Sequence, residues 1–156
     1  MKNERFVYND IEIDIYQNAI FFIWLSYKLD REWNILEAFS AKTASWKILQ
    51  DIKDKSWKNI VMLNLVQWVP LDKNWKIRYP SNVEKKKWYE YIKWLIEKYN
   101  PEKIFLFGKQ VQDMFEKDRD KYDNRLCFFE HPSYISVYKK SKVEDYKQDI
   151  LDSLNN

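Results

Sequence analysis

Four short apolar runs, each followed by a segment with helical patterning, are the feature that most constrains the fold of this chain. The run from Ala19 to Leu25 is continuously apolar, which is typical of a central strand covered on both faces. The other three runs span residues 59–69, 103–107 and 126–129. Strands that alternate with helices form parallel sheets with helices packed on both faces. The sequence therefore predicts a three-layer α/β/α sandwich with a mainly parallel four-stranded central sheet, formed as a single domain by residues 1–156.

Helical spacing and capping residues mark the segments between these runs. The expected helices run between Thr43 and Lys53, from a cap at Ser81 or Asn82 to Asn100, from Gly108 to about Tyr122, and onward from a capping box at Ser141 and Glu144. Near the N-terminus, Ile11–Tyr16 alternates apolar and polar residues, which indicates a half-buried or edge strand. Residues 130–140 are expected to form a loop.

Composition excludes several classes of site. Gly108 is the only glycine, which excludes the glycine-rich phosphate-binding loops of nucleotide and dinucleotide sites. Cys127 and His131 are also single, so we expect no disulfide framework, no cysteine-based zinc or iron–sulfur site and no two-histidine metal motif. We therefore expect no metal and no cofactor. The chemistry that remains uses one imidazole, carboxylates, hydroxyls, amides and lysines.

The charge balance and the apolar runs bear on partners and location. The formal net charge is +3, from 27 basic and 24 acidic residues, which is too mild to indicate nucleic-acid binding by itself. The longest apolar run, Ala19 to Leu25, is far shorter than the ~20 residues of a membrane-spanning helix. The first residues lack the pattern of a signal peptide. We expect a cytoplasmic monomer that does not bind a membrane.

The loops that follow the strands contain the candidate functional residues, because ligands of such sheets bind at the carboxyl ends of the strands. His131 lies in the stretch Glu130-His-Pro-Ser133, after the fourth run. Asn64 lies within the second run, in the middle of an expected strand, where asparagine is disfavoured and a buried amide needs partners. Two plainer interpretations stay open. His131 can be a surface histidine in a proline turn, and Asn64 can be a core hydrogen-bonding residue.

Three segments together resemble the uracil-DNA glycosylase superfamily. Val61-Met-Leu-Asn64 is similar to the strand whose asparagine reads the edge of a pyrimidine, and His131–Tyr138 is similar to the family's histidine–proline–serine loop. Lys103–Lys109 occupies the position of the family's strand followed by glycine, between the other two segments. The resemblance extends from about Asn59 to Leu154 in order and spacing.

The resemblance implies a base-excision mechanism on DNA, with the target nucleotide flipped out of the duplex into the protein. Ala38-Phe39-Ser40 is similar to the family segment whose phenylalanine stacks on the flipped base. Phe39 would then stack on the base, and Asn64 would pair with its Watson–Crick edge. As the glycosidic bond breaks, His131 would donate a hydrogen bond to the negative charge that develops on a base oxygen.

The same resemblance implies which residues position the attacking water and which residues contact DNA. Counting back from Phe39 without gaps puts Ser26 where active members have the residue that positions the water, and a small shift would bring Asp30 or Glu32 there instead. The partner is expected to be duplex DNA approached from its minor groove. The expected phosphate contacts are Ser133, Ser136, Lys139 and Lys140, and the expected wedge that fills the gap left by the flipped base is Tyr134 or Ile135.

Several functions remain open at this point. Serine is a poor water activator without a neighbouring base, so a catalytically inactive member that binds DNA or protein is the alternative to an active glycosylase. A variant of the active enzyme is an antiviral glycosylase that excises modified phage bases. The excised base itself is left open. Trp75 and Tyr79 lie in an expected loop outside the three matching segments. We expect these two residues to contact a ligand in preference to the tryptophans in helices.

Overall fold

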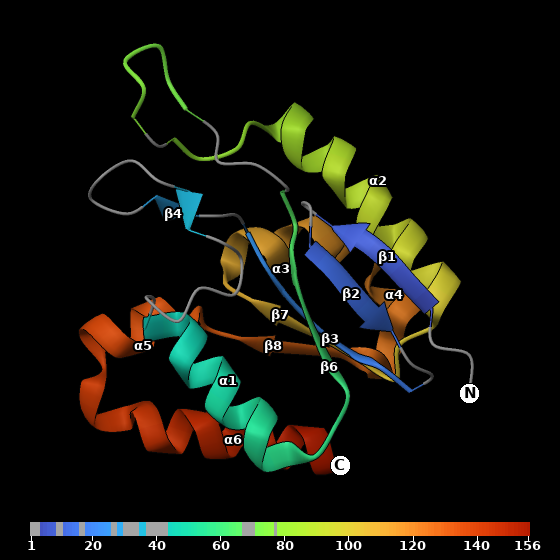
Figure 1. The fold of residues 1–156 in the computed structure, drawn as a ribbon, viewed down its shortest axis with the longest axis vertical. Coiled ribbons are helices and arrows are strands. Elements are labelled where there is room, and N and C mark those ends of the chain that lie inside the picture. The colour runs from blue at the N-terminus through green and yellow to red at the C-terminus, as the bar shows by residue number, and fades with distance from the viewer. Residues whose placement is uncertain are drawn as a thin grey trace.

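A parallel sheet of four strands lies at the centre of the fold (Figure 1). The computed structural model describes residues 4–8, 11–15, 18–25, 28–29, 35–36, 44–66, 71–76 and 78–156. The sheet strands are β3 (Ile20–Trp24), β6 (Ile60–Asn64), β7 (Lys103–Phe107) and β8 (Leu126–Phe129), in the spatial order β6-β3-β7-β8. Every neighbouring pair is parallel. The predicted fold class is therefore confirmed.

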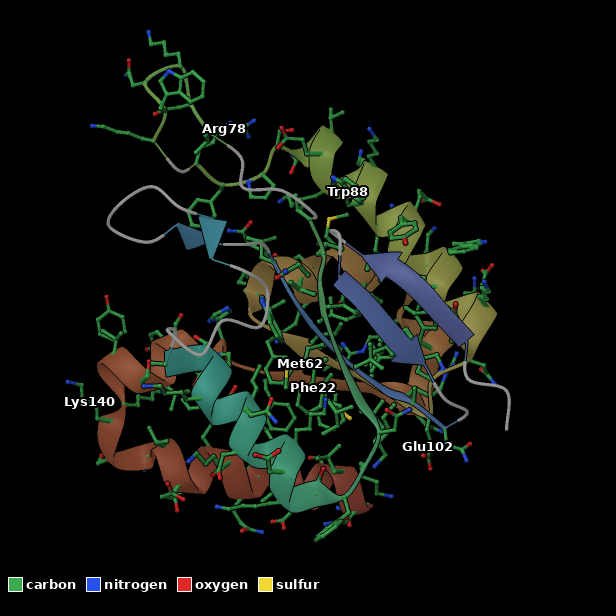
Figure 2. The ribbon with its side chains drawn as sticks, in the orientation of Figure 1. Phe22, Met62, Arg78, Trp88, Glu102 and Lys140 are labelled. Carbon is green, nitrogen blue, oxygen red and sulfur yellow. The ribbon has the colours of Figure 1, made fainter. Side chains whose placement is uncertain are left out.

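Helices cover both faces of this sheet. One face packs against α1 (Ala44–Ser56), α5 (Pro132–Tyr138) and α6 (Val143–Asn155), through a cluster that includes Phe22 and Met62. Figure 2 shows these two side chains together between the sheet and α1. The other face packs against α2 (Asn82–Tyr99), α3 (Lys109–Phe115) and α4 (Arg119–Tyr122). Successive residues of each central strand enter opposite clusters, because side chains alternate across a strand, and this alternation explains why the runs are continuously apolar.

The order of the strands creates a topological switch between β3 and β7. The chain passes from β3 through α1 to β6 on one side, and then through α2 to β7 on the other side of β3. The connecting helices α1 and α2 accordingly pack on opposite faces of the sheet (Figure 1). In open α/β sheets ligands bind outside the carboxyl ends of the strands at such a switch. The fold therefore indicates a ligand site among the residues that follow β3, β6, β7 and β8.

Two small antiparallel pairs accompany the central sheet. The segment that the alternating pattern predicted as a strand is β2 (Ile11–Ile15), and it pairs with β1 (Glu4–Tyr8), which the sequence analysis did not predict. The second pair joins β4 (Lys28–Leu29) to β5 (Ile35–Leu36). The described strand β2 thus belongs to a separate sheet and is not an edge strand of the central one.

Two helix predictions and one loop prediction need correction. The expected helix from Gly108 to Tyr122 is divided into α3, the 3-10 turn η1 (Glu116–Asp118) and α4. Residues 130–140 are not a plain loop, because they contain α5. The final helix begins at Val143 after the 3-10 turn η3 (Lys140–Lys142), and no side chain caps it, so the capping box predicted at Ser141 is wrong. A one-turn 3-10 segment supplies the start of the helix in its place.

Helix α2 is capped as predicted. The Ser81 hydroxyl accepts from the Glu84 backbone N–H, and the Glu84 carboxylate accepts from the Ser81 N–H in return. Glu84 also forms a bidentate pair with Arg78, at 2.7 and 3.0 Å. These contacts hold the pKa of Glu84 at about 2, below its ordinary 4.5, chiefly through the hydrogen bond from Arg78 and then through the Ser81 backbone N–H. At its other end the helix stops at Asn100, which adopts a left-handed conformation.

The depressed pKa of Glu84 predicts an acid-sensitive contribution to stability. A carboxyl with a lower pKa in the folded state than in the unfolded state stabilises the fold above about pH 4.5, and this stabilisation is lost as the pH falls towards about 2. Glu84→Gln keeps an acceptor for the capping box but removes the charge. We expect wild type to melt above Glu84→Gln at pH 6, with the difference shrinking towards pH 2. Thermal melts across this range, with Glu90→Gln on the same helix as control, check it. A difference independent of pH would contradict it.

Candidate functional site

The candidate residues that the structure describes gather at the carboxyl edge of the sheet. Asn64 is the last residue of β6 and lies beside Trp24, the last residue of β3. Gly108 directly follows β7, and His131 comes two residues after β8. In parallel strands the carboxyl ends meet at one edge, and these ends bracket the topological switch between β3 and β7. The sequence-predicted residues Asn64 and His131 therefore share an edge, on the two outermost strands of the four.

His131 is the N-cap residue of α5. Its backbone is extended, Pro132 occupies the first helical position, and its Nδ1 accepts the backbone N–H of Ser133 at 3.1 Å. The Ser133 hydroxyl lies 2.7 Å from the same nitrogen. Proline suits this position because the first helical N–H has no partner within the helix. The stretch Glu130-His-Pro-Ser133 thus forms a helix start, and the imidazole itself satisfies one of its N–H groups.

This cap determines the tautomer of His131. A backbone N–H can only donate, so Nδ1 must present a lone pair and the ring proton must lie on Nε2. The imidazolium ion has no acceptor, so the cap requires the neutral ring. The local fold therefore prepares His131 as a neutral hydrogen-bond donor through Nε2. Such a group can stabilise negative charge on a ligand oxygen without giving up a proton.

Gly108 and Gln112 connect the ends of β7 and β8 beneath His131. The Gly108 N–H donates to the Phe129 carbonyl at 2.9 Å, and the Gln112 side chain donates to the carbonyls of both Leu106 and Phe129. A Cβ added at Gly108 would lie 3.5 Å from the His131 Cβ, and Gly108 has a φ of +94°, which side-chain-bearing residues rarely adopt. The single glycine of the chain therefore allows the backbone to turn close against His131.

Tyr146 holds the backbone that precedes His131. Its hydroxyl, which reaches from α6, donates to the Glu130 carbonyl at 2.7 Å, and its ring packs edge-on against Phe129. Burial raises the pKa of the Tyr146 phenol far above its ordinary value of 10, so the hydroxyl stays a donor. Neither Gln112 nor Tyr146 was predicted from the sequence. No local pattern distinguishes Tyr146 from the other tyrosines. Gln112 did offer a signal, because it lies one helical turn after Gly108 and so close to the end of the preceding strand.

Removing the Tyr146 hydroxyl tests this tether. Tyr146→Phe leaves the Glu130 carbonyl without that donor, and we expect the free energy of unfolding to fall by about 0.5–1.5 kcal/mol. Urea denaturation followed by circular dichroism measures it. Tyr134→Phe is the matched control, because Tyr134 is exposed. Loss of its hydroxyl is expected to change stability little. Equal losses in both variants would argue against the tether.

Asn64 is completely buried and ends β6, where the sequence analysis placed it in mid-strand. The strand is shorter than predicted: it stops at Asn64, and Leu65 and Val66 follow it as bends. The backbone N–H groups of these two residues donate to the carbonyls of Trp24 and Leu25, which continues the contact between the chain segments beyond the strands. Asn64 is the only polar residue in the buried set of the described chain. Asn64 thus lies buried at the carboxyl edge of the sheet, and its role in reading a base stays a prediction.

The residues predicted to contact DNA lie in and after helix α5, and they differ in exposure. Ile135 is only 3% exposed and packs in the core against α1 and α6, so of the two wedge candidates Tyr134 alone is at the surface. The Ser136 hydroxyl donates to the Ser133 carbonyl within the helix. Beyond the helix, Lys139 pairs with Glu130 at 3.2 Å, and Lys140 is exposed at the outer end of α5 (Figure 2).

The remaining predicted site residues lie outside the described part of the chain. These are the candidate water-positioning residues Ser26, Asp30 and Glu32 and the candidate stacking residue Phe39. Among the residues that the structure does describe, no group of three histidine, cysteine or acidic side chains is arranged to hold a metal ion. Within the same residues, no helix is both long enough and apolar enough to cross a membrane.

Comparisons with known proteins agree with this geometry. A family model described as the uracil DNA glycosylase superfamily matches residues 21–155. A sequence search of curated proteins finds no match. Among solved structures, the wild-type SMUG2 of Pedobacter heparinus is similar in fold, with a TM-score of 0.66 at 14% identity, over 89% of this chain and 75% of that chain.

The described chain has a glycosylase-like fold, with a four-stranded parallel sheet and a histidine two residues after the last strand of that sheet. Because the family model matches most of its length, the chain belongs to the uracil DNA glycosylase superfamily. The likeness to SMUG2 at 14% identity concerns the fold alone.

Proposed function

We propose that this protein is a DNA glycosylase that flips a nucleotide out of DNA and hydrolyses the bond between its base and sugar. The observation that supports this most strongly is the state of His131. Its Nδ1 accepts the Ser133 N–H, so its Nε2 carries the proton at the carboxyl edge of the sheet. A neutral donor in this place suits a reaction in which negative charge develops on a base oxygen as the glycosidic bond breaks. Membership of the superfamily supports the same reaction.

Base recognition falls to Asn64 and Phe39 in this proposal. The Asn64 amide can donate and accept at once, which matches the Watson–Crick edge of a pyrimidine. It ends β6 within the buried edge of the sheet, so a base would meet it only after leaving the DNA stack. Phe39 would stack on the face of the flipped base. The base is uracil or another altered base, including the modified bases of phage DNA.

Contacts to DNA outside the base are assigned to α5 and the residues after it. Tyr134, which is exposed, is the wedge that fills the gap left by the flipped nucleotide. Ser133, Ser136, Lys139 and Lys140 meet the phosphates, although the Glu130 carboxylate competes for Lys139. We propose that a cytoplasmic monomer approaches duplex DNA from its minor groove through this surface.

Hydrolysis requires a group that positions water, and Ser26 or Asp30 would serve. Serine is a poor water activator unless a base lies next to it, so Ser26 in this role would favour a second candidate function, a glycosylase-like module that binds DNA without cutting the glycosidic bond. The two functions share one fold and one surface, so only chemistry separates them.

Release of free base distinguishes these two functions. Purified protein is incubated with matched oligonucleotides that contain uracil, thymine derivatives or modified cytosines, and the released bases are separated by chromatography. An active glycosylase releases one of these bases in proportion to time and enzyme concentration. Salt-sensitive binding of the same oligonucleotides with no released base would replace the glycosylase proposal with the binding module.

A further inference from the structure

The segment from Leu71 to Ser81, which we call the Trp75 loop, has a well-defined hairpin turn at its tip. The Asp72 N–H donates to the Lys76 carbonyl, and the Trp75 N–H donates to the Asp72 carbonyl. The Asp72 carboxylate also accepts the backbone N–H groups of Asn74 and Lys76, at 2.8 and 3.0 Å. One aspartate thus organises the whole turn. In the described part of the loop, residues 71–76 and 78–81, these hydrogen bonds set the turn from Asp72 to Lys76.

This turn displays Trp75 in an unusual way. Trp75 has a φ of +62°, in the left-handed region that asparagine and glycine occupy far more readily than bulky residues. Its side chain is nonetheless 73% exposed, so packing against the protein does not explain why a tryptophan is there. Conformation and exposure do not by themselves assign a role, because Trp57 shares both; Trp75 differs in its place, in a loop that follows the carboxyl end of β6.

The base of the loop is anchored to the protein body. Arg78 donates to the Leu71 carbonyl on the opposite arm of the loop and forms its bidentate pair with Glu84 in the first turn of α2. Next to this anchor, Tyr79 exposes a second large ring. Figure 2 shows Arg78 at the root of a loop that projects from the body. Two exposed aromatic rings therefore lie in a loop whose base is joined to α2 by an ion pair.

The charge around these rings is positive. Lys73 and Lys76 are exposed in the turn, and Lys85 and Lys86 lie in the first turns of α2, directly after the anchor. The Arg78 charge is offset by Glu84, and Asp72 offsets one of the four lysines, so a positive surplus that suits a polyanion remains. The loop joins the carboxyl end of β6 to the start of α2, so it borders the same edge of the sheet as His131. Strands β6 and β8 are three strand spacings apart, or about 14 Å, so the loop and α5 lie on opposite sides of the candidate site.

We propose that the Trp75 loop is a second nucleic-acid contact, in which Trp75 and Tyr79 stack on unpaired bases of a DNA strand and Lys73 and Lys76 contact its phosphates. Aromatic rings bind single strands because every base offers a flat face, and that face is open only where the strand is unpaired. The proposal rests on the proposed function only in taking DNA as the partner. It adds a single-stranded segment beside the flipped nucleotide.

Binding of a fluorescein-labelled single-stranded oligonucleotide, measured by anisotropy, tests the stacking. Trp75→Asn removes the ring and retains a residue that tolerates the left-handed turn. The control is Trp57→Asn: Trp57 also has a positive φ, of 59°, and is 94% exposed, but it lies between α1 and β6 at the opposite edge of the sheet. We expect Trp75→Asn to weaken binding by about 5- to 150-fold, the range for loss of one stacked base, and Trp57→Asn to leave it unchanged.

Two further arms separate stacking from other contacts. A blunt duplex of the same sequence is expected to lose much less affinity with Trp75→Asn, and an equal loss on both DNAs would contradict stacking. Replacing Lys73 and Lys76 with glutamine is expected to reduce the salt slope of single-strand binding by about 1.4, since each phosphate contact contributes about 0.7. An unchanged slope would contradict the phosphate contacts.

The binding assay reports on the loop independently of catalysis. Single-strand affinity that is the same in wild type, Trp75→Asn and Trp57→Asn would overturn the proposal and leave the loop as a surface for a protein partner. Base release measured on the same oligonucleotides tests the glycosylase activity separately, so an inactive protein that still loses affinity with Trp75→Asn would overturn the proposed reaction and support the loop contact.

Discussion

Replacing His131 with serine is expected to lower the rate of base release by about 10²- to 10³-fold, the usual effect of losing one donor to a developing negative charge. The proposed mechanism gives the reason, because its one donor to the base oxygen is the Nε2–H of a ring whose Nδ1 accepts the Ser133 N–H. Single-turnover kinetics with protein in excess over the most reactive oligonucleotide measure the chemical step without interference from product release.

The choice of serine separates catalysis from folding. Serine is a good N-cap residue, so His131→Ser keeps an acceptor for the Ser133 N–H at the start of α5. His131→Ala loses this cap as well and is expected to be less stable than His131→Ser by about 0.5–2 kcal/mol. Both variants should lose base release to the same degree. Retention of activity in His131→Ser would show that the imidazole matters only as a cap.

The largest expected loss of stability is at the centre of the sheet. Phe105 lies in β7 and is completely buried, with its ring stacked on Phe129 at 5.7 Å and 5.0 Å from the ring of Phe22. Truncation of a buried phenylalanine leaves a cavity that surrounding side chains fill only in part. We expect Phe105→Ala to lower the free energy of unfolding by about 3–5 kcal/mol.

A matched control is available one strand away. Phe128 in β8 is the same residue type but is 38% exposed and contacts the Arg119 guanidinium over its ring. Phe128→Ala is expected to cost about 1 kcal/mol or less, because no closed cavity forms. Urea denaturation of the three proteins gives the comparison. Similar losses in both variants would contradict the assignment of Phe105 to the core.

Much of the central layer could be predicted because each strand has an apolar run with clear ends. The ranges Lys103–Phe107 and Leu126–Phe129 agree with β7 and β8. The run from Asn59 to Val69 did not reveal where its strand ends, because the apolar residues continue into the bends after Asn64. Apolar composition reports burial, and burial at the edge of this sheet extends beyond the hydrogen-bonded strand.

Local capping signals were less dependable. The predicted capping box at Ser81 and Glu84 is present, and Arg78 also binds the Glu84 carboxylate. The similar pattern at Ser141 and Glu144 forms no capping box, because Ser141 lies within a 3-10 turn. The helix α5 was not predicted, because its seven residues are too short to show a helical period. Only the tertiary context distinguishes these cases.

The position of His131 and Asn64 at one edge of the sheet could be predicted, whereas the contacts that support His131 could not. His131 and Asn64 stood out because each residue is unusual in its segment, and the parallel topology brings both to one edge. The hydrogen bonds from Gln112 and Tyr146 join segments that are distant in sequence, so no local pattern contains them. The functional roles of His131 and Asn64 stay predictions until base release is measured.

The tautomer of His131 is the most direct test of the proposed mechanism. Because the chain has one histidine, labelling with ¹⁵N-histidine gives a single pair of ring nitrogens in an NMR spectrum. Long-range correlation between these nitrogens and the ring carbon-bound protons distinguishes a protonated from an unprotonated nitrogen. We predict that the ring in the folded protein has its proton on Nε2 and a lone pair on Nδ1. A proton on Nδ1, or averaging between the two tautomers as in a free imidazole, would contradict a prepared donor at this site.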